Sequence, residues 1–469
     1  MRKKYRQLKS FFSKKEVIII LIITFLGVLL AFSTKAATPF ISIEVESGTK
    51  QGVQPINDSS ASNNQYIQFG SGSPNSSTNA GVFITKAELN RAKSRQGTAD
   101  PYGASYSLQT SLANDYLSRS PNVFYMTESD YLNNLSYSWC GQDTDNIDNS
   151  LKNASDKLEN DGSYTRVLAM QYALTSDSKY GSKAAEFLKA WANNSRVINM
   201  YDFDMNTAGS ASLRGMTDGL CSFRPWNFAL DSMWQGYGLI NFSDSYVLLK
   251  NNGYQFSSAD DQAIKAYLLR LAEAVNSSYH AWTKWADNHT SSSSYIRYRA
   301  DNHLSWAQAM LLSAAVALDD QNLANYCLNG GTWYDSKAGN YTNPSPIKTL
   351  LDKAILADGR IIDPVEFDRP EQYTYFHLWP MQLSSLIAER HYGENLWEYK
   401  GSDGASLQKA YTTAVNNVVS GGYSNEAWQF EVPYNKWGGS SLKSARDSTN
   451  RLQVIKQSIG PVVLLFGEN

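Results

Sequence analysis

From residue 82 to its end, the chain carries apolar residues at the 3.6-residue spacing of α-helices. In residues 258–275, Ser258 and Asp261 have the spacing of a capping box at the start of such a pattern. The apolar stripe that follows consists of Ile264, Tyr267, Leu268, Leu271 and Val275. The same spacing predicts helices at 83–92, 105–119, 146–158, 164–175, 181–193, 227–249, 258–278, 302–318, 346–355, 374–390, 405–419 and 452–464. Since no strand-like run interrupts these segments, the sequence predicts an all-α domain over 82–469.

We expect these helices to form a closed ring. No short motif repeats at the period of roughly 34 to 45 residues that common helical repeats have, which argues against an open solenoid. An (α/α)-toroid, an incomplete double ring of helical hairpins, accommodates this length as one domain. The helix at 302–318 is apolar on nearly all sides, as a buried inner helix would be. The loops between inner and outer helices line a cleft in such a ring, and function is expected on those loops.

The first 36 residues have the order of an export signal. Eight Lys or Arg residues and one acid accompany an uncharged apolar run over 17–32, and Ser33–Ala37 offers a small-residue cleavage site. The run is slightly shorter than the roughly 20 residues that span a bilayer. Residues 1–36 are therefore predicted to be a signal peptide or, if uncleaved, an N-terminal anchor in contact with the membrane. Either way the body is exported and is extracellular, periplasmic or tethered to the outer face of the cytoplasmic membrane.

The small net charge of -2 hides an asymmetry between this segment and the rest. When residues 1–36 are removed from totals of 42 basic and 44 acidic residues, 34 basic and 43 acidic residues remain. The body is therefore acidic, and binding to nucleic acid, which needs a basic surface, is not expected.

Two short segments separate the export signal from the helices. Residues 37–69 have strand-like patches at 41–45 and 66–69 and resemble the opening of β-sandwich carbohydrate-binding modules. At about 30 residues the segment is too short for a complete sandwich, so we interpret it as a vestige or a short packed hairpin. Residues 70–81 contain only Gly, Ser, Asn, Thr, Ala and Pro, which is typical of a flexible linker.

The three cysteines are too few and too widely spaced for a metal site. Cys140, Cys221 and Cys327 allow at most one internal disulfide, and their spacings resemble no zinc motif. No metal and no cofactor is expected.

Two polar segments bring histidine together with other reactive side chains, each at the start of a predicted helix. The first runs from Arg297 to Trp306 and the second from Glu366 to His377. A uronate lyase must neutralise the sugar carboxylate, remove the proton at C5 and protonate the departing C4 oxygen. An amide, an imidazole, a guanidinium and a phenol can perform these tasks, and both segments together contain all four.

At these segments the sequence resembles the alginate-lyase-type polysaccharide lyases, which have an (α/α)-toroid fold. Asn302, His303 and Trp306 look like the family's Asn-His motif, and Arg369 with Tyr373-Thr-Tyr-Phe376 looks like its Arg and Tyr-x-x-Phe segment. Further landmarks in the same order lie at 81–89, 166–177, 190–192, 226–229 and 358–359, so that the similarity spans roughly residues 81–430.

The resemblance implies catalytic roles for four residues. Asn302 and His303 would hold the uronate carboxylate, Arg369 would assist, Tyr373 would transfer the protons, and His303 would act as base for the other sugar epimer. The segment around Arg369 is more acidic than is usual in the family, so that Arg297, Arg299 and Arg360 are substitutes for it. Residues expected to contact the substrate are Trp226, Asn227, Arg299, Trp306 and His377. The implied partner is an acidic uronate polymer, and the chain is expected to act as a monomer.

Other interpretations remain open at the level of sequence. Asn302 could merely cap its helix, Tyr375 competes with Tyr373, and the tryptophans could be core residues. A glycoside hydrolase on the same toroid would need two carboxylates, for which Asp301, Asp363, Glu366 and Asp368 are available. A non-catalytic, glycan-binding envelope protein is the third possibility. The sequence specifies neither the polymer nor endo or exo action.

Overall fold

The structure, a computed structural model, describes residues 55–57, 65–67, 78–124, 149–195, 197, 224–288, 300–336, 339–366, 370–420, 422–448 and 460–467. The chain divides into two compact units, Met1–Ser71 and Gly72–Asn469. The predicted signal or anchor over 1–36 lies outside the described residues. None of the helices in the described ranges combines the length and the apolar composition that a bilayer span requires.

In the smaller unit, the described residues form an antiparallel strand pair. β1 (Pro55–Asn57) pairs with β2 (Gln65–Ile67), with Ile56 opposite Tyr66. β2 overlaps the strand-like patch predicted at 66–69, whereas the patch at 41–45 lies outside the described residues.

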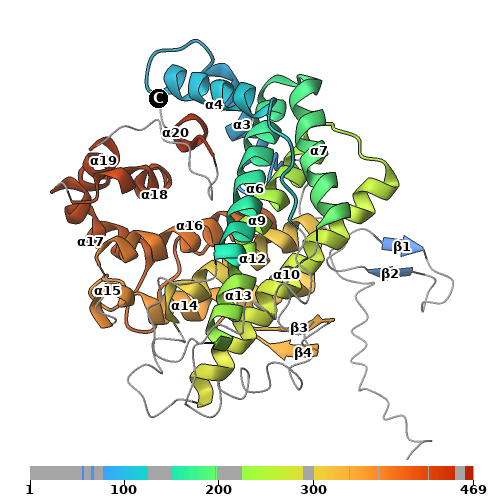
Figure 1. The fold of residues 1–469 in the computed structure, drawn as a ribbon. Coiled ribbons are helices and arrows are strands. Elements are labelled where there is room, and N and C mark those ends of the chain that lie inside the picture. Colours follow the sequence, from blue (N-terminus) through green and yellow to red (C-terminus); the bar gives the residue numbers. More distant parts are fainter. Residues whose placement is uncertain are drawn as a thin grey trace, which may run out of the picture. The chain divides into compact units, whose positions relative to one another are not determined.

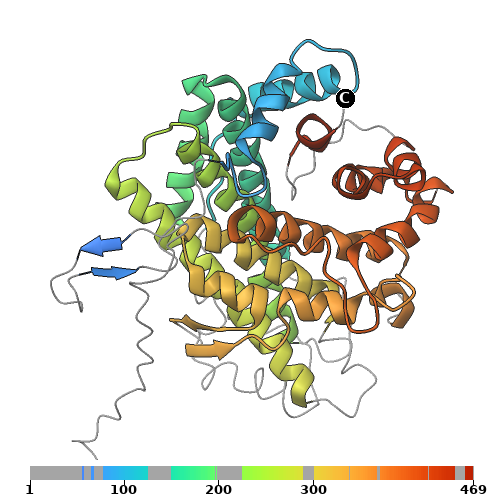
Figure 2. The same cartoon turned by 180° about the vertical axis from the view of Figure 1, so that it is seen from behind.

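The larger unit is built almost entirely of helices, which confirms the all-α prediction (Figures 1 and 2). Its first helices are α3 (Lys86–Ser94), α4 (Tyr102–Tyr116), α6 (Asn149–Thr175), α7 (Ser178–Asn194), α9 (Arg224–Asn251), α10 (Ser258–Asn288), α12 (Asn302–Leu318) and α13 (Gln321–Asn329). After the hairpin of β3 (Thr332–Asp335) and β4 (Gly339–Thr342) come α14 (Ile347–Ala354), α15 (Ile362–Glu366), α16 (Gln372–Tyr392), α17 (Leu407–Val419), the 3-10 helix η4 (Ser424–Phe430), α18 (Glu431–Trp437), α19 (Ser440–Asp447) and α20 (Val462–Phe466).

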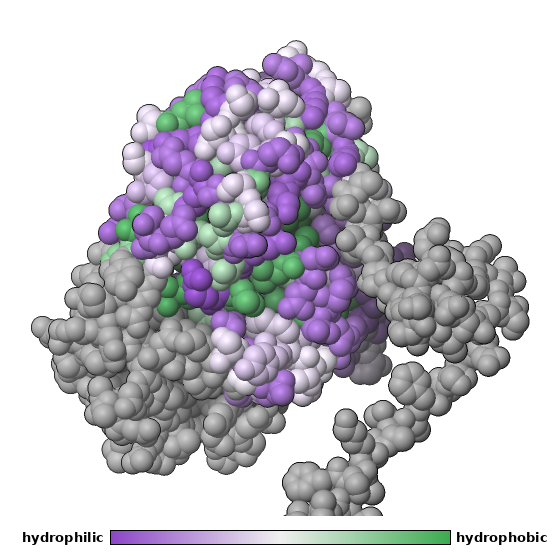
Figure 3. All heavy atoms as spheres, turned by 90° about the vertical axis from the view of Figure 1, so that its right-hand side faces the viewer, coloured by the Kyte–Doolittle hydropathy of each residue, from purple (hydrophilic) through white to green (hydrophobic). Residues whose placement is uncertain are grey.

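The long helices pack in sequence across the middle of this unit. α6 packs on α9, α9 on α10 and α12, and α12 on α16, as Figures 1 and 2 show. Their facing sides form one continuous apolar core. On the face drawn in Figure 3, hydrophilic residues predominate among the described residues, and the hydrophobic ones appear as smaller patches between them.

α12 is the inner helix that the sequence predicts. Fourteen of its residues are buried, among them Trp306, Met310 and Leu311. The structure corrects the capping interpretation, because Asp301 is the N-cap and Asn302 is the first helical residue. Asp301 accepts a hydrogen bond from the backbone N–H of Leu304 and so satisfies one donor of the first turn.

Several elements differ from the prediction, since α13, α15, η4, α18 and α19 lie outside all of the predicted helical ranges. The helices predicted at 146–158 and 164–175 are one helix, α6. The polar residues between them do not form a loop, because they are part of the helix and contact a neighbouring helix. Asp161 in this stretch is buried and accepts a hydrogen bond from Trp191 Nε1, and Gly162 lies against Gly238 of α9. The hairpin of β3 and β4 was not predicted, since each strand has only four residues.

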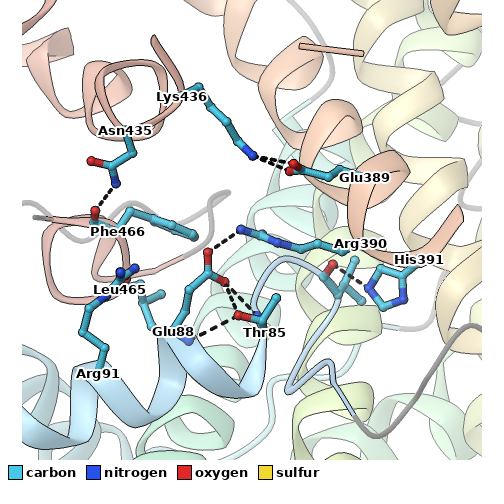
Figure 4. A network of polar contacts seen from close by, with 11 residues as sticks. Thr85, Glu88, Arg91, Glu389, Arg390, His391, Asn435, Lys436, Leu465 and Phe466 are labelled. Carbon is cyan, nitrogen blue, oxygen red and sulfur yellow. Dashed lines mark hydrogen bonds and ion pairs between the residues drawn. The ribbon is translucent and has the colours of Figure 1, made fainter. Parts of the chain in front are cut away.

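The two ends of the larger unit are joined by polar contacts. α20 packs on α3 and α4. Arg91 donates to the carbonyl of Leu465, and Arg95 donates to those of Val463 and Leu464 at 3.2 and 2.8 Å. Figure 4 shows Arg390 paired with Glu88 beside these contacts, at 2.6 Å.

Candidate active site

His303, in the first turn of α12, is oriented by a carboxylate. Its Nδ1 lies 2.9 Å from Asp301 Oδ2. The Asp301 side chain is 1% exposed and the His303 side chain 24% exposed, so that the imidazole lies between a buried anion and the surface. A carboxylate at Nδ1 favours the tautomer that carries its proton there, which leaves Nε2 as the proton acceptor of the ring. This tautomer has the protonation pattern that a histidine general base requires.

A buried polar network connects this helix with α15 and α16. Asn302 Nδ2 donates to Asp363 Oδ1 at 2.6 Å, and Asp363 Oδ2 lies 2.5 Å from His377 Nδ1. His377 Nε2 in turn lies 2.6 Å from Ser305 Oγ, back on α12. The network brings together the two polar segments that the sequence singled out, which are about 70 residues apart along the chain.

Tyr373 and Tyr375 have different environments, which separates the two competing tyrosines. Tyr375 is fully buried and donates to the carbonyl of Ala414 at 2.9 Å, and burial raises its pKa. Tyr373 is half-buried in the first turn of α16 and packs edge to face on Phe376. Of the two tyrosines, only Tyr373 has surface exposed to solvent.

An aromatic cluster lies next to Tyr373. The rings of Tyr237, Phe376 and Trp379 surround Trp306, with centroids 5.2, 5.4 and 5.2 Å away. The pKa of Tyr237 is raised mainly by burial and to a smaller extent by the nearby Glu159 and Tyr373. The cluster therefore packs α9 and α12 against the turn that carries Tyr373.

Burial corrects two of the predicted substrate contacts. Trp306 is 1% exposed, so that its ring is a core residue here and not a platform for a sugar. His377 is 0% exposed, and both of its nitrogens contact protein groups. Asn302 has no exposed surface either, although its Oδ1 has no hydrogen-bond partner among the described residues.

The remaining predicted residues are placed only in part. Arg297, Arg299 and Arg369 lie outside the described residues. Trp226 and Asn227 belong to α9, but their side chains are not among those described. Arg360 is exposed and pairs with Asp358 at 2.7 Å, just before α15.

Two of the four carboxylates that a hydrolase could use are engaged by other side chains. Asp301 contacts His303, and Asp363 contacts Asn302 and His377, with both carboxylates almost completely buried. Asp368 lies outside the described residues, as does the side chain of Glu366. Neither Asp301 nor Asp363 is placed to protonate a glycosidic oxygen.

Other reactive groups lie away from this site. A cavity of about 250 Å³ lies at the opposite ends of α12 and α16, where its lining includes Ala317 and His391. Lys250 and Lys265, which also line it, both pair with Asp261. Within the described part of the chain, no group of three or more His, Cys, Asp and Glu side chains is arranged to hold a metal ion. Cys327 is a buried free thiol, and burial raises its pKa.

Comparisons with known proteins agree with the arrangement of the helices. A family model described as alginate lyase matches residues 100–422, a range that contains Asn302, His303 and Tyr373. The fold is similar to the crystal structure of an alginate lyase from Bacteroides ovatus, with a TM-score of 0.54 and 15% sequence identity. That match covers 83% of this chain and 99% of the other, and it confirms the predicted (α/α)-toroid. No curated protein sequence matches this chain.

Proposed function

The chain belongs to the alginate lyase family and is a polysaccharide lyase, and on this premise we propose that it cleaves an alginate-like uronate polymer by β-elimination. The observation that carries the proposal is the hydrogen-bonded connection between the N-terminal parts of α12 and α16, through Asp363 and His377. This connection supports a single site formed by the segment of His303 and the segment of Tyr373.

In the proposed reaction the C5–H and C4–O4 bonds break and a C4–C5 double bond forms. Neutralising the uronate carboxylate acidifies C5, and we assign this task to Asn302, His303 and an arginine. Because Asn302 is fully buried, its role requires that the surrounding side chains move when the polymer binds. Arg369 is the first choice for the arginine, with Arg297 and Arg299 as substitutes.

Proton transfer is assigned to His303 and Tyr373. For one epimer, Tyr373 removes the C5 proton and protonates the departing O4 oxygen. For the other, His303 Nε2 accepts the C5 proton while Tyr373 protonates O4. The contact of Asp301 with Nδ1 supports this role, because it stabilises the imidazolium formed when Nε2 takes the proton.

The double bond makes the proposal directly testable. Purified protein incubated with mannuronate, guluronate, glucuronate and galacturonate polymers should generate near-ultraviolet absorbance with at least one of them. His303→Ala and Tyr373→Phe should each lower the rate about 10²- to 10⁴-fold, with polymer binding largely retained. Tyr375→Phe is the matched control, since Tyr375 is buried away from solvent, and it should keep most of the rate. Polymer binding without absorbance on any polymer would favour a non-catalytic glycan-binding protein instead.

The proposal extends to location, which rests on the sequence of residues 1–36. Their basic start and apolar run support export, and a polymer-degrading lyase needs access to polysaccharide outside the cell. Cell fractionation and N-terminal sequencing of the mature protein distinguish a cleaved signal from an anchor.

A further inference from the structure

One buried carboxylate contacts residues from both segments of the candidate active site. Asp363, in the short helix α15, accepts the Asn302 amide from α12 and pairs with His377 from α16. Both Asp363 and His377 are 0% exposed. Leaving a buried carboxylate without its partners costs free energy, so these contacts hold the N-terminal parts of α12 and α16 at one separation.

Ser305, His377 and Asp363 have the hydrogen-bond connectivity of a serine hydrolase triad. Ser305 Oγ lies 2.6 Å from His377 Nε2, and Asp363 lies at the other nitrogen. A nucleophilic serine must be open to its substrate, whereas Ser305 is 2% exposed and the other two residues are completely buried. The triad geometry therefore serves another purpose.

The contact with Asp363 also fixes the orientation of the Asn302 amide. At 2.6 Å the bond to a carboxylate is short and charge-assisted, and it holds Nδ2 on the side of Asp363. Since the nitrogen and oxygen of an amide are nearly equal in size, its orientation depends on such partners. Without Asp363, nothing described on that side of Asn302 specifies which way the amide points.

We propose that Asp363 and His377 are positioning residues, which hold Asn302, His303 and Tyr373 in the arrangement that elimination requires. The inference rests on the proposed function, because it assigns these two buried residues to the same site. Neither residue contacts the polymer. Each acts through the first turns of α12 and α16, where small displacements of reacting groups are costly.

The test compares two buried carboxylates with the same kind of partner. Asp363→Ala removes the acceptor of Asn302, and Asp335→Ala removes the acceptor of Asn276, which joins α10 to β3 elsewhere in the protein at 2.9 Å. Both variants should lose thermal stability. At a temperature at which both are folded, kcat should fall about 30- to 100-fold in Asp363→Ala with KM nearly unchanged, and less than about threefold in Asp335→Ala. Asp363→Asn keeps an oxygen acceptor and the side-chain volume, so its kcat should be about tenfold higher than that of Asp363→Ala.

A second measurement does not depend on lyase activity. The chain has five histidines, and ¹³C labelling resolves their ring signals by NMR. Asp363→Ala should shift the signals of His303 and His377, and Asp335→Ala should shift neither. If the histidine signals shift as expected in Asp363→Ala but the wild-type protein cleaves no uronate polymer, the proposed function fails and the positioning contact stands. Equal loss of kcat in both alanine variants, unshifted His303 signals in Asp363→Ala, or inactivation by a serine-directed reagent would overturn the positioning role.

Discussion

At the level of single residues, the orientation of His303 depends on Asp301. Asp301 caps α12 through one oxygen and contacts His303 Nδ1 through the other. Asn is as good an N-cap as Asp, so Asp301→Asn should leave the helix intact. An Asn amide N–H directed at Nδ1 would donate a hydrogen bond to it and favour the opposite tautomer, which has no acceptor at Nε2. We expect kcat to fall about 10- to 100-fold with the melting temperature nearly unchanged.

The control for Asp301→Asn is the same substitution at another N-cap. Asp177 caps α7 through the backbone N–H of Lys179 and is well exposed. Asp177→Asn should change neither kcat nor melting temperature. If Asp301→Asn retains full activity, His303 does not depend on this carboxylate for its tautomer.

Sequence reasoning found the residue types of the site but not their surroundings. Two adjoining clusters follow from the motif at Asn302 and His303 and from the Tyr-x-x-Phe segment. The sequence suggests a role for Asp363 only as the carboxylate of a hydrolase. Its actual partners lie 61 and 14 residues away along the chain. Burial also separates Tyr373 from Tyr375, although the two differ by only two positions. These properties follow from tertiary packing, which a local pattern does not contain.

At the level of elements, the helical period predicted most of the helices of the larger unit. The sequence predicts two helices where α6 is one, because polar residues interrupt the apolar pattern. Periodicity alone cannot distinguish an exposed loop from polar residues that are buried against another helix. The hairpin of β3 and β4 was missed because alternation over four residues is too short to recognise. In β3, Trp333 and Asp335 are buried and bonded to other elements, Trp333 to Asp320 and Asp335 to Asn276.

The close contact of α6 and α9 depends on a glycine. A Cβ added at Gly238 of α9 would lie 2.5 Å from Leu158 Cγ, and Leu158 is buried. Gly238→Ala should therefore force the helices apart and destabilise the protein by about 1–2 kcal/mol, even though Ala favours the helix by up to about 1 kcal/mol. Urea denaturation measures the difference. The control is Ser182→Ala, at an exposed position of α7, which should change the free energy of unfolding by less than about 0.5 kcal/mol. If Gly238→Ala is as stable as the wild type, the Leu158 side chain can move aside.

At the level of the larger unit, its two ends stabilise each other through buried arginines. Arg95 is 3% exposed and donates to several carbonyls at the end of α20, and Asn435 donates to that of Phe466 (Figure 4). Arg95→Ala would leave buried carbonyls without donors, and we expect a loss of about 2–4 kcal/mol in urea denaturation. Arg119→Ala is the control, because Arg119 forms an exposed ion pair with Asp115. Such a pair contributes at most about 1 kcal/mol. Equal losses of stability in Arg95→Ala and Arg119→Ala would show that the two ends of the larger unit do not stabilise each other.

Stability of the larger unit should also depend on pH through His391 at the end of α16. Its Nε2 lies 2.9 Å from the carbonyl of Val82, and its Nδ1 lies 3.4 Å from Asn79 Nδ2. Burial, opposed by the backbone contact with Val82 and reinforced by the nearby Arg390, lowers its pKa from 6.5 to about 4. The folded protein thus keeps His391 neutral, while the unfolded chain binds a proton below pH 6.5.

The contribution of neutral His391 to the free energy of unfolding is therefore complete above pH 6.5 and decreases as the pH falls toward 4. Between pH 7 and pH 5 the decrease should be about 2 kcal/mol. Urea denaturation of the wild type and of His391→Gln across this range measures it, because Gln keeps a donor for Val82 but does not titrate. The variant should lose most of the slope, whatever its stability at pH 7. The same slope in both proteins would assign the pH dependence to other groups, since His391 would then titrate alike in the folded and unfolded chains.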